Sequence, residues 1–287
     1  MQEKYYDGKK EFKDLLEMTE DIFSSPIKRW AEYCLTGEKI DIDVSEWAMN
    51  NYVNVYDYLK GLTPTKQRRY LYKYEVEAHG VVFRGDTMTS FANFIRKYIK
   101  EKENLRNIGK EKCAEKIRLG EYTDIDDYMV ELAYLQHTQG NLMPVPLCFN
   151  VERSGMWADS DYWDIVMYNI YKWCESGDER YIYDLLNRYN TNTHMAESLY
   201  RFKCWMSLYH NNWSEFLDRN YLRAFTDSEG YPIEFWKNHF AFNRKIDALS
   251  FSEFEDSVKL INALIINRNK EIMDKNKSII YGGGVSN

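Results

Sequence analysis

Residues 137–153 carry the sequence HTQGNLMPVPLCFNVER, which interrupts a chain of mainly helical pattern near its middle. The stretch holds two of the five prolines, and a Gly-Asn pair precedes them. Proline lacks a backbone N–H and disfavours helical geometry in the residue before it, so the helix that approaches this stretch must end there. A hydrophobic core rarely contains side chains such as His, Gln, Asn, Glu and Arg. We therefore expect a loop that positions polar groups on a helical scaffold.

Apolar residues recur at intervals of three and four on both sides of this stretch, as on the buried face of a helix. Phe91, Phe94 and Ile95 begin one such face. Capping boxes are expected to start helices at Thr123 and at Ser252, the latter with Glu255 three residues on. Further helices are predicted over residues 14–35, 45–61, 160–177, 180–188, 196–210 and 213–221, and a turn is predicted over 227–232.

Three short segments predict a small sheet beside the central loop. They lie near residues 40–44, 80–84 and 143–149, where apolar residues alternate with polar ones or stand between glycines or prolines. The charged segment 66–79 is expected to face solvent. The predicted fold class is mainly α with at most a small β-sheet. We expect one globular domain over residues 1–274, with a candidate internal boundary within 100–120, and a flexible tail over 275–287.

Composition excludes several classes of protein. Aromatic residues make up 16% of the 287 residues, which argues against a disordered chain, and the net charge of -7 argues against non-specific coating of DNA. No apolar run is long enough to span a membrane and no signal peptide is visible, so we expect a cytoplasmic protein that does not bind membranes. The five cysteines show no paired spacing, which favours reduced thiols over disulfides or zinc ligands.

The sequence predicts no metal site and no cofactor. His194, His210 and His239 lack the spacing of metal ligands and are expected at the surface or at helix caps. The glycine-rich loops of common nucleotide-binding folds do not occur either, because the Gly282–Gly284 run stands in the tail rather than between a strand and a helix.

Polar residues of the central stretch, together with the segment near residue 86, form the candidate site. A mixed loop of this kind on a helical scaffold is a favoured place for function, although buried Asn and His also serve to satisfy loop backbone groups. We predict catalytic roles for His137 and Asp86, and ligand-binding roles for Arg84, Asn141, Asn150 and Arg153. Histidine would serve as the acid or base, and arginine as the contact to an anion.

The segment from His137 to Leu142, followed by Asn150, resembles the Gly-Asn-Leu segment of His-Asn-His nuclease domains. In that family the segment belongs to a ββα-metal fold, preceded by a strand that carries the histidine that activates water. Here no Asp-His-Ile segment precedes residue 137, so the resemblance covers the loop without the catalytic strand.

A broader pattern is similar to an uncharacterised family of bacterial proteins. It comprises Asp86-Thr-Met-x-Ser-Phe, His137-x-x-Gly-Asn-x-x-Pro, Phe149-Asn150, Asn220-Tyr-Leu, and Gly230-Tyr-Pro followed by Trp236. The resemblance implies that these segments belong to one domain and meet in space. Phe83-Arg84-Gly85 also resembles a segment of ADP-ribosyltransferases, but the downstream Ser-Thr-Ser strand and catalytic glutamate of that class have no counterpart.

Two functions from different classes remain open. In the first, a polar pocket at the central loop binds, or binds and hydrolyses, a phosphate-bearing nucleotide or nucleic acid. In the second, the protein is a non-catalytic interaction module, for example in host–phage conflict, that docks on a protein partner through Tyr and Trp side chains. The aromatic residues Trp163, Tyr171, Trp173, Trp205, Tyr209 and Trp213 have helical spacing, which favours core packing over a stacking surface for bases or sugars.

Overall fold

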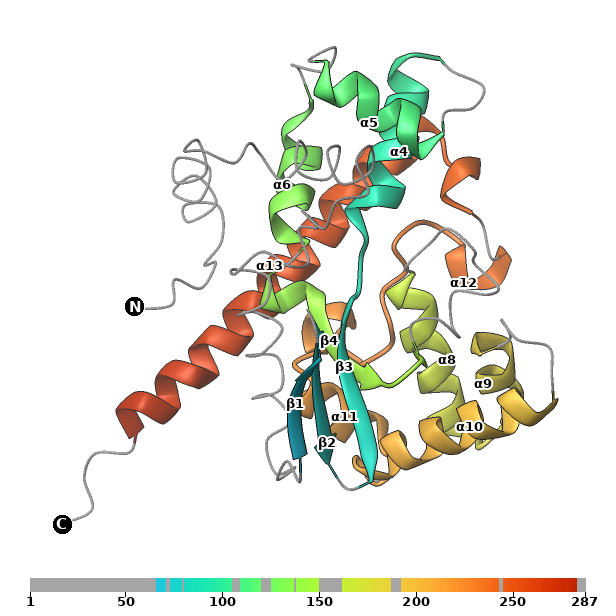
Figure 1. Cartoon of the computed structure of the whole chain (residues 1–287), viewed down its shortest axis with the longest axis vertical. Helices are drawn as coiled ribbons and strands as arrows, with labels where there is room; N and C mark the ends of the chain where they lie inside the picture. Colours follow the sequence, from blue (N-terminus) through green and yellow to red (C-terminus); the bar gives the residue numbers. More distant parts are fainter. Residues whose placement is uncertain are drawn as a thin grey trace.

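The computed structural model describes residues 66–70, 73–78, 80–104, 109–119, 125–136, 138–149, 162–186, 192–242 and 245–282 (Figure 1). The helices predicted over 14–35 and 45–61 and the strand near 40–44 lie outside these residues. Within them the fold is mainly α with a small antiparallel sheet, as the sequence predicts.

Four strands form the sheet in the order in which they occur along the chain: β1 (Lys66–Tyr70), β2 (Lys73–Ala78), β3 (Val81–Thr87) and β4 (Leu142–Pro146). The central stretch therefore supplies the strand that pairs with β3, with Asp86 opposite Met143. Both prolines lie in β4, which is compatible with a strand at the edge of a sheet because proline cannot donate to the ladder.

Most of the charged segment 66–79 forms the hairpin of β1 and β2, two strands that the sequence did not predict. The antiparallel register places Arg68 opposite Glu75 and Lys66 opposite Glu77. Residues of opposite charge that face each other across a ladder stabilise it. The register thus places residues of opposite charge at facing positions of the ladder.

The helices are α4 (Phe91–Lys102), α5 (Lys110–Arg118), α6 (Asp127–Leu135), α8 (Trp163–Ser176), α9 (Arg180–Leu185), α10 (Asn192–Ser207), α11 (Trp213–Arg219), α12 (His239–Phe242) and α13 (Phe251–Gly282). Short 3₁₀ turns occur at η3 (Gln139–Asn141), η4 (Arg223–Phe225) and η5 (Ile246–Ala248). Gly177 ends α8 in the left-handed conformation, with φ of 69°, as its place in the sequence predicts.

The capping box of α13 lies two residues before its predicted position. Ser250 Oγ accepts a hydrogen bond from Glu253 N at 3.2 Å, and Ser250 N donates to Glu253 Oε2 at 3.0 Å. Both Ser250 and Ser252 have an acid three residues on, so the sequence pattern fits either start. The start of α6 was also predicted too early, since its N-cap is Asp126 rather than Thr123.

The long helix α13 organises the described molecule. Figure 1 shows it running diagonally past α4, α5 and α6, while α8 to α11 gather beside the sheet. It packs against α4, α6, η3 and η4. One buried cluster extends from Val81 to Ile266 and includes Cys113 and Ile117 of α5, within the predicted boundary region 100–120.

Helix α13 also continues to Gly282, into residues for which the sequence predicts a flexible tail. Helix propagation costs less than nucleation, so a helix that is anchored along its earlier turns can continue in this way. Among the described helices, none has the length and apolar character needed to cross a bilayer.

Candidate functional site

Asn141 of the central stretch is fully buried and binds main chain. Its Oδ1 accepts from Thr89 N at 3.0 Å, while its Nδ2 donates to Thr89 O at 2.9 Å and to Gln136 O at 2.8 Å. Both amide N–H groups and the amide oxygen are therefore engaged. These contacts fasten the segment after β3 to the central stretch, and they do not support the ligand-binding role that the sequence suggested for Asn141.

Gly140 is a glycine because α13 packs closely against its backbone. Its N–H donates to Asn269 Oδ1 of α13 at 2.5 Å, and Asn269 Nδ2 donates to Thr138 Oγ1 at 3.0 Å. A β-carbon at position 140 would lie 2.7 Å from Asn269 Cγ and closer still to Ile265 O. Only glycine allows α13 to approach the backbone this closely.

Arg268, on the buried face of α13, adds further contacts to the central stretch, and we call this set of contacts the joint. Its side chain is fully buried, and its guanidinium donates to Leu142 O at 2.8 Å, Gly140 O at 2.9 Å and Asn220 O at 2.9 Å. Backbone carbonyls here satisfy a charged group that would otherwise be costly to bury. The joint thus binds together α13, the central stretch and the turn after α11.

Arg268 is not among the residues predicted for the site, although the sequence carries a signal for it. The residue stands four positions after Leu264 and three after Ile265, on the buried stripe of the last helix. A charged residue at such a position must bring its own polar partners into the core. The Gly-Asn loop is where those partners lie.

The remaining predicted residues are placed only in part. Asp86 is buried in β3, and Arg84 lies in the same strand opposite Val145. The Arg84 side chain and all of His137, Asn150 and Arg153 lie outside the residues that the structure describes. The catalytic roles of His137 and Asp86 and the anion contacts of the two arginines therefore remain predictions.

A buried acid–histidine pair lies elsewhere, between α8 and α12. His239 Nδ1 stands 2.5 Å from Asp164 Oδ2, and both side chains are fully buried. The same carboxylate oxygen accepts from Phe235 N at 2.8 Å. The prediction that His239 is a surface or cap histidine is wrong, because Asp164 supplies a buried partner that is distant in sequence. His210, by contrast, is an exposed histidine paired with Glu215.

This pair fastens residues 235–239 to α8. The His239 ring lies 3.9 Å from the Trp236 ring, and Tyr162 meets it edge-on at 5.0 Å, measured between centroids. The rings of Trp236 and Tyr162 cover the imidazole of His239, and both members of the pair are fully buried. We therefore interpret the Asp164–His239 pair as structural. Among the described residues, no group of three or more His, Cys, Asp or Glu side chains could hold a metal ion.

The aromatic surface is a group of five rings that cluster at the surface beside α8. Its members are Tyr168 and Tyr171 of α8, Trp213 of α11, Tyr231 of the turn that follows η4, and Phe240 of α12. Tyr231 is 36% exposed and the other four are partly exposed. The predicted core packing is confirmed for Trp163, Trp173, Trp205 and Tyr209, whereas Tyr171 and Trp213 contribute to this surface.

Tyr231 has ring neighbours from two helices. Its centroid lies 5.3 Å from Tyr171, 6.1 Å from Phe240 and 6.3 Å from Tyr168, with the ring planes steeply inclined in each pair. Tyr168 and Phe240 stack at 4.4 Å. Burial raises the pKa of the Tyr231 hydroxyl, and Tyr168 and Glu234 add to the effect, so this hydroxyl stays neutral at neutral pH.

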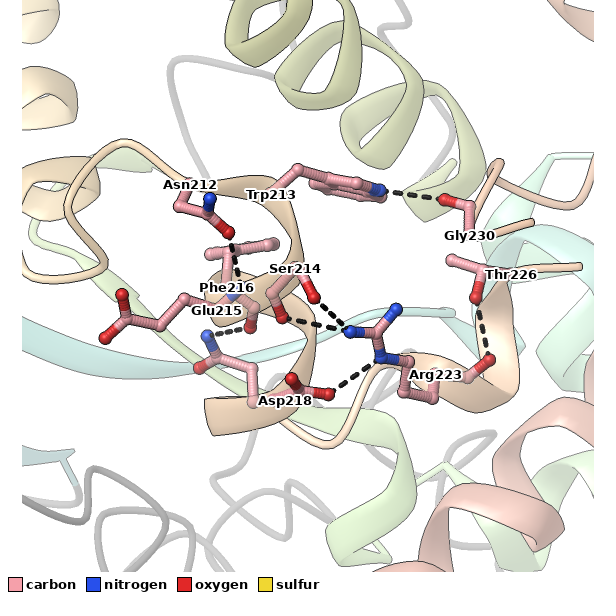
Figure 2. Close-up of polar contacts among 10 residues, drawn as sticks. Asn212, Trp213, Ser214, Glu215, Phe216, Asp218, Arg223, Thr226 and Gly230 are labelled. Carbon is pink, nitrogen blue, oxygen red and sulfur yellow. Dashed lines mark hydrogen bonds and ion pairs between the residues drawn. The ribbon is translucent and has the colours of Figure 1, made fainter. Parts of the chain in front are cut away.

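The turn that carries Tyr231 is held rigidly. Asp227 Oδ1 accepts from Glu229 N and Tyr231 N, each at 2.9 Å, and Gly230 adopts the left-handed conformation with φ of 84°. Trp213 Nε1 donates to Gly230 O at 2.8 Å (Figure 2). The turn predicted over residues 227–232 is therefore present, and a ring of the aromatic surface fastens it.

Arg223 supports the base of the same turn. Figure 2 shows its guanidinium between α11 and η4, where it contacts Asp218 at 2.7 Å and bonds to Ser214. Asn212 caps α11 by accepting from Glu215 N at 2.9 Å. The side chains of Arg223 and Asn212 are thus held in place by polar contacts within the protein.

Lys172 stands over the aromatic surface. Its Nζ lies 5.7 Å from the ring centroids of both Tyr168 and Tyr171. An ammonium group at this distance from a ring face is attracted by the π electrons. The surface therefore combines apolar area with one positive charge.

Comparison with protein-family models, with curated proteins and with solved structures gives no match to this chain.

Proposed function

We propose that this protein is a non-catalytic interaction module that binds a protein partner through the aromatic surface. The observation that carries the proposal is the position of Tyr231, which is exposed although it packs against Tyr168, Tyr171 and Phe240. An isolated exposed tyrosine is ordinary. Five partly exposed rings in mutual contact form the kind of patch that marks interaction sites.

The rigidity of the surface favours binding. Tyrosine and tryptophan dominate the binding energy of protein interfaces because they bury a large area at low cost in side-chain entropy. The rings are already restrained by one another, and the Asp227 contacts restrain the turn beneath Tyr231. Less entropy is lost on binding when the contacting groups are ordered beforehand.

The geometry of the rings favours a protein partner over a base or a sugar. Stacking of a planar ligand needs an open ring face. Lys172 stands over the faces of Tyr168 and Tyr171, and Tyr168 also stacks on Phe240. Side chains of a protein can pack against ring edges and against the lysine stem without displacing either.

The contacts of the central stretch also favour a binding role over catalysis at the Gly-Asn loop. The Asn141 amide hydrogen-bonds main chain, and Gly140 is covered by Asn269. A pocket built from His137, Arg84, Asn150 and Arg153 remains the alternative, as a site for a phosphate-bearing ligand.

The test is site-specific photo-crosslinking in the cells that produce the protein. A benzophenone amino acid at position 231 should give a defined adduct with another protein. Tyr183 of α9 is the matched control, because it is 39% exposed but lies outside the aromatic surface. The same group at position 183 should not give that adduct.

Competition separates specific from adventitious capture. An excess of unmodified wild-type protein should abolish the adduct, whereas an excess of the Tyr231→Ala protein should not. The same adduct from positions 231 and 183, or equal competition by both proteins, would contradict the proposal.

A further inference from the structure

We infer that the partner presents an acidic segment, whose carboxylate pairs with Lys172 while its apolar side chains cover the aromatic surface. This inference rests on the proposed function and names the chemistry of the partner. It starts from the charge that the surface carries.

Lys172 has no ion-pair partner within the described part of the chain. Its contacts there are the two tyrosine rings, and Glu175, three residues on along α8, makes no ion pair with it. Lysine and an acid at this spacing commonly pair on a helix surface. Here the rings direct the ammonium over the aromatic surface instead.

Neighbouring cations differ in this respect. Arg180 of α9 pairs with Asp178, Lys203 of α10 with Glu179, and Arg223 of η4 with Asp218. Each of these basic groups has a carboxylate from the same chain. Lys172, by contrast, has no such carboxylate among the described residues and lies against the aromatic surface, where a partner can provide the counter-charge.

Two of the three acidic side chains within residues 227–234 hydrogen-bond to local backbone, and the third, that of Glu229, is exposed. Glu234 accepts from Phe240 N at 2.8 Å and from Asn238 N at 3.1 Å, and Asp227 accepts from Tyr231 N. Donors around a carboxylate offset its charge. Repulsion of an acidic partner by these two groups is reduced, while Lys172 remains available to attract it.

The rings prepare Lys172 for this contact. Two ring faces restrain a side chain that would otherwise lose much rotamer entropy on binding. A carboxylate that approaches from the solvent side completes a charge-assisted hydrogen bond. Partial burial by the partner's apolar side chains then strengthens that bond, because the local dielectric falls.

Short fluorescent peptides test the inference on the full chain by fluorescence anisotropy. The first alternates Glu with Leu and Tyr, the second has Gln at every Glu position, and the third has Lys there. We expect the Glu peptide to bind roughly tenfold more tightly than the Gln peptide, and the Lys peptide to bind most weakly. Higher salt should reduce the advantage of the Glu peptide.

Variants assign the preference to one residue. Lys172→Gln should abolish the preference for Glu over Gln, Lys172→Glu should shift it toward the Lys peptide, and Lys172→Arg should retain it. Lys203→Gln is the control, because Lys203 is a surface lysine already paired with Glu179. Tyr231→Ala should weaken the binding of every peptide.

The outcomes separate the inference from the proposed function. Equal binding of the three peptides that depends on Tyr231 would overturn the acidic partner and leave the docking surface intact. Peptide binding unaffected by Tyr231→Ala would overturn the proposed function. Failure of the Glu peptide to bind, or tighter binding of a fluorescent oligonucleotide than of the Glu peptide, would also overturn the inference.

Discussion

The backbone N–H of Gly140 donates to Asn269 Oδ1 at 2.5 Å, which joins the central stretch directly to α13, the longest of the described helices. Asn269 in turn donates to Thr138, and its neighbour Arg268 reaches the carbonyls of Gly140 and Leu142. The described residues 138–142 of the central stretch therefore form the docking site of α13, mainly through their backbone. The described part of this loop joins α13 to the sheet.

Gly140→Ala should lower the free energy of unfolding by about 1–3 kcal/mol, the usual cost of overpacking. The added methyl group would overlap Asn269 Cγ and Ile265 O, both held within a helix. Urea denaturation measures the loss. Gly109→Ala is the control, because a β-carbon there meets nothing within 4 Å. Equal stability of the two variants would contradict the account of the joint.

Arg268→Met should destabilise the protein by about 3 kcal/mol or more, because several buried carbonyls lose their donor together. Methionine preserves much of the apolar stem, so the loss reports the guanidinium contacts. Arg268→Lys should cost less, since lysine keeps the charge and three donors. Thermal unfolding followed by circular dichroism compares the two, and an Arg268→Met protein as stable as wild type would refute the assignment.

The pair formed by Asp164 and His239 should show strong coupling in a double-mutant cycle of alanine variants. Removing one partner of a buried pair typically costs about 3–5 kcal/mol, because the other is left unsatisfied. The exposed pair of His210 and Glu215 serves as the comparison, with an expected coupling of about 0–1 kcal/mol. A coupling for the buried pair no larger than that of the exposed pair would contradict the structural role.

Cys174 should resist alkylation in the folded protein. Burial raises the pKa of its thiol to about 12, and Glu175 adds to the effect. The thiolate is the reactive form, so at pH 8 folded Cys174 should react more slowly with iodoacetamide than it does after unfolding in urea. Mass spectrometry of the labelled peptides measures both rates. Cys148 is exposed and should be labelled first. Equal rates for Cys174 before and after unfolding would show that its environment does not protect it.

Local signals predicted much of the scaffold. The left-handed glycine after α8, the apolar stripes of α4 and α13 and the prolines of β4 each follow from rules that act over a few residues. The hairpin of β1 and β2 was not predicted because the facing positions of its ladder belong to two different strands. The capping box of α13 was misplaced because two serines satisfied the same pattern.

The candidate site was harder to predict because its parts are distant in sequence. Asp164 meets His239, and Tyr168 meets Tyr231, only after α8 packs against the segment that follows η4. Periodicity identifies a buried face but does not say which side chains at its margin stay exposed. The role of Asn141 was open for the same reason, since its partners Thr89 and Gln136 belong to other elements.

The affinity of two folded variants for the protein crosslinked at position 231 tests the central claim most directly. Titration calorimetry should be carried out well below the melting temperatures of both variants. We predict that Tyr231→Ala lowers affinity at least tenfold with a smaller loss of stability than Asn141→Ala, while Asn141→Ala leaves affinity within about twofold of wild type. Loss of affinity in the folded Asn141→Ala protein, together with wild-type affinity in Tyr231→Ala, would contradict the account. Binding would then depend on the central loop rather than on the aromatic surface.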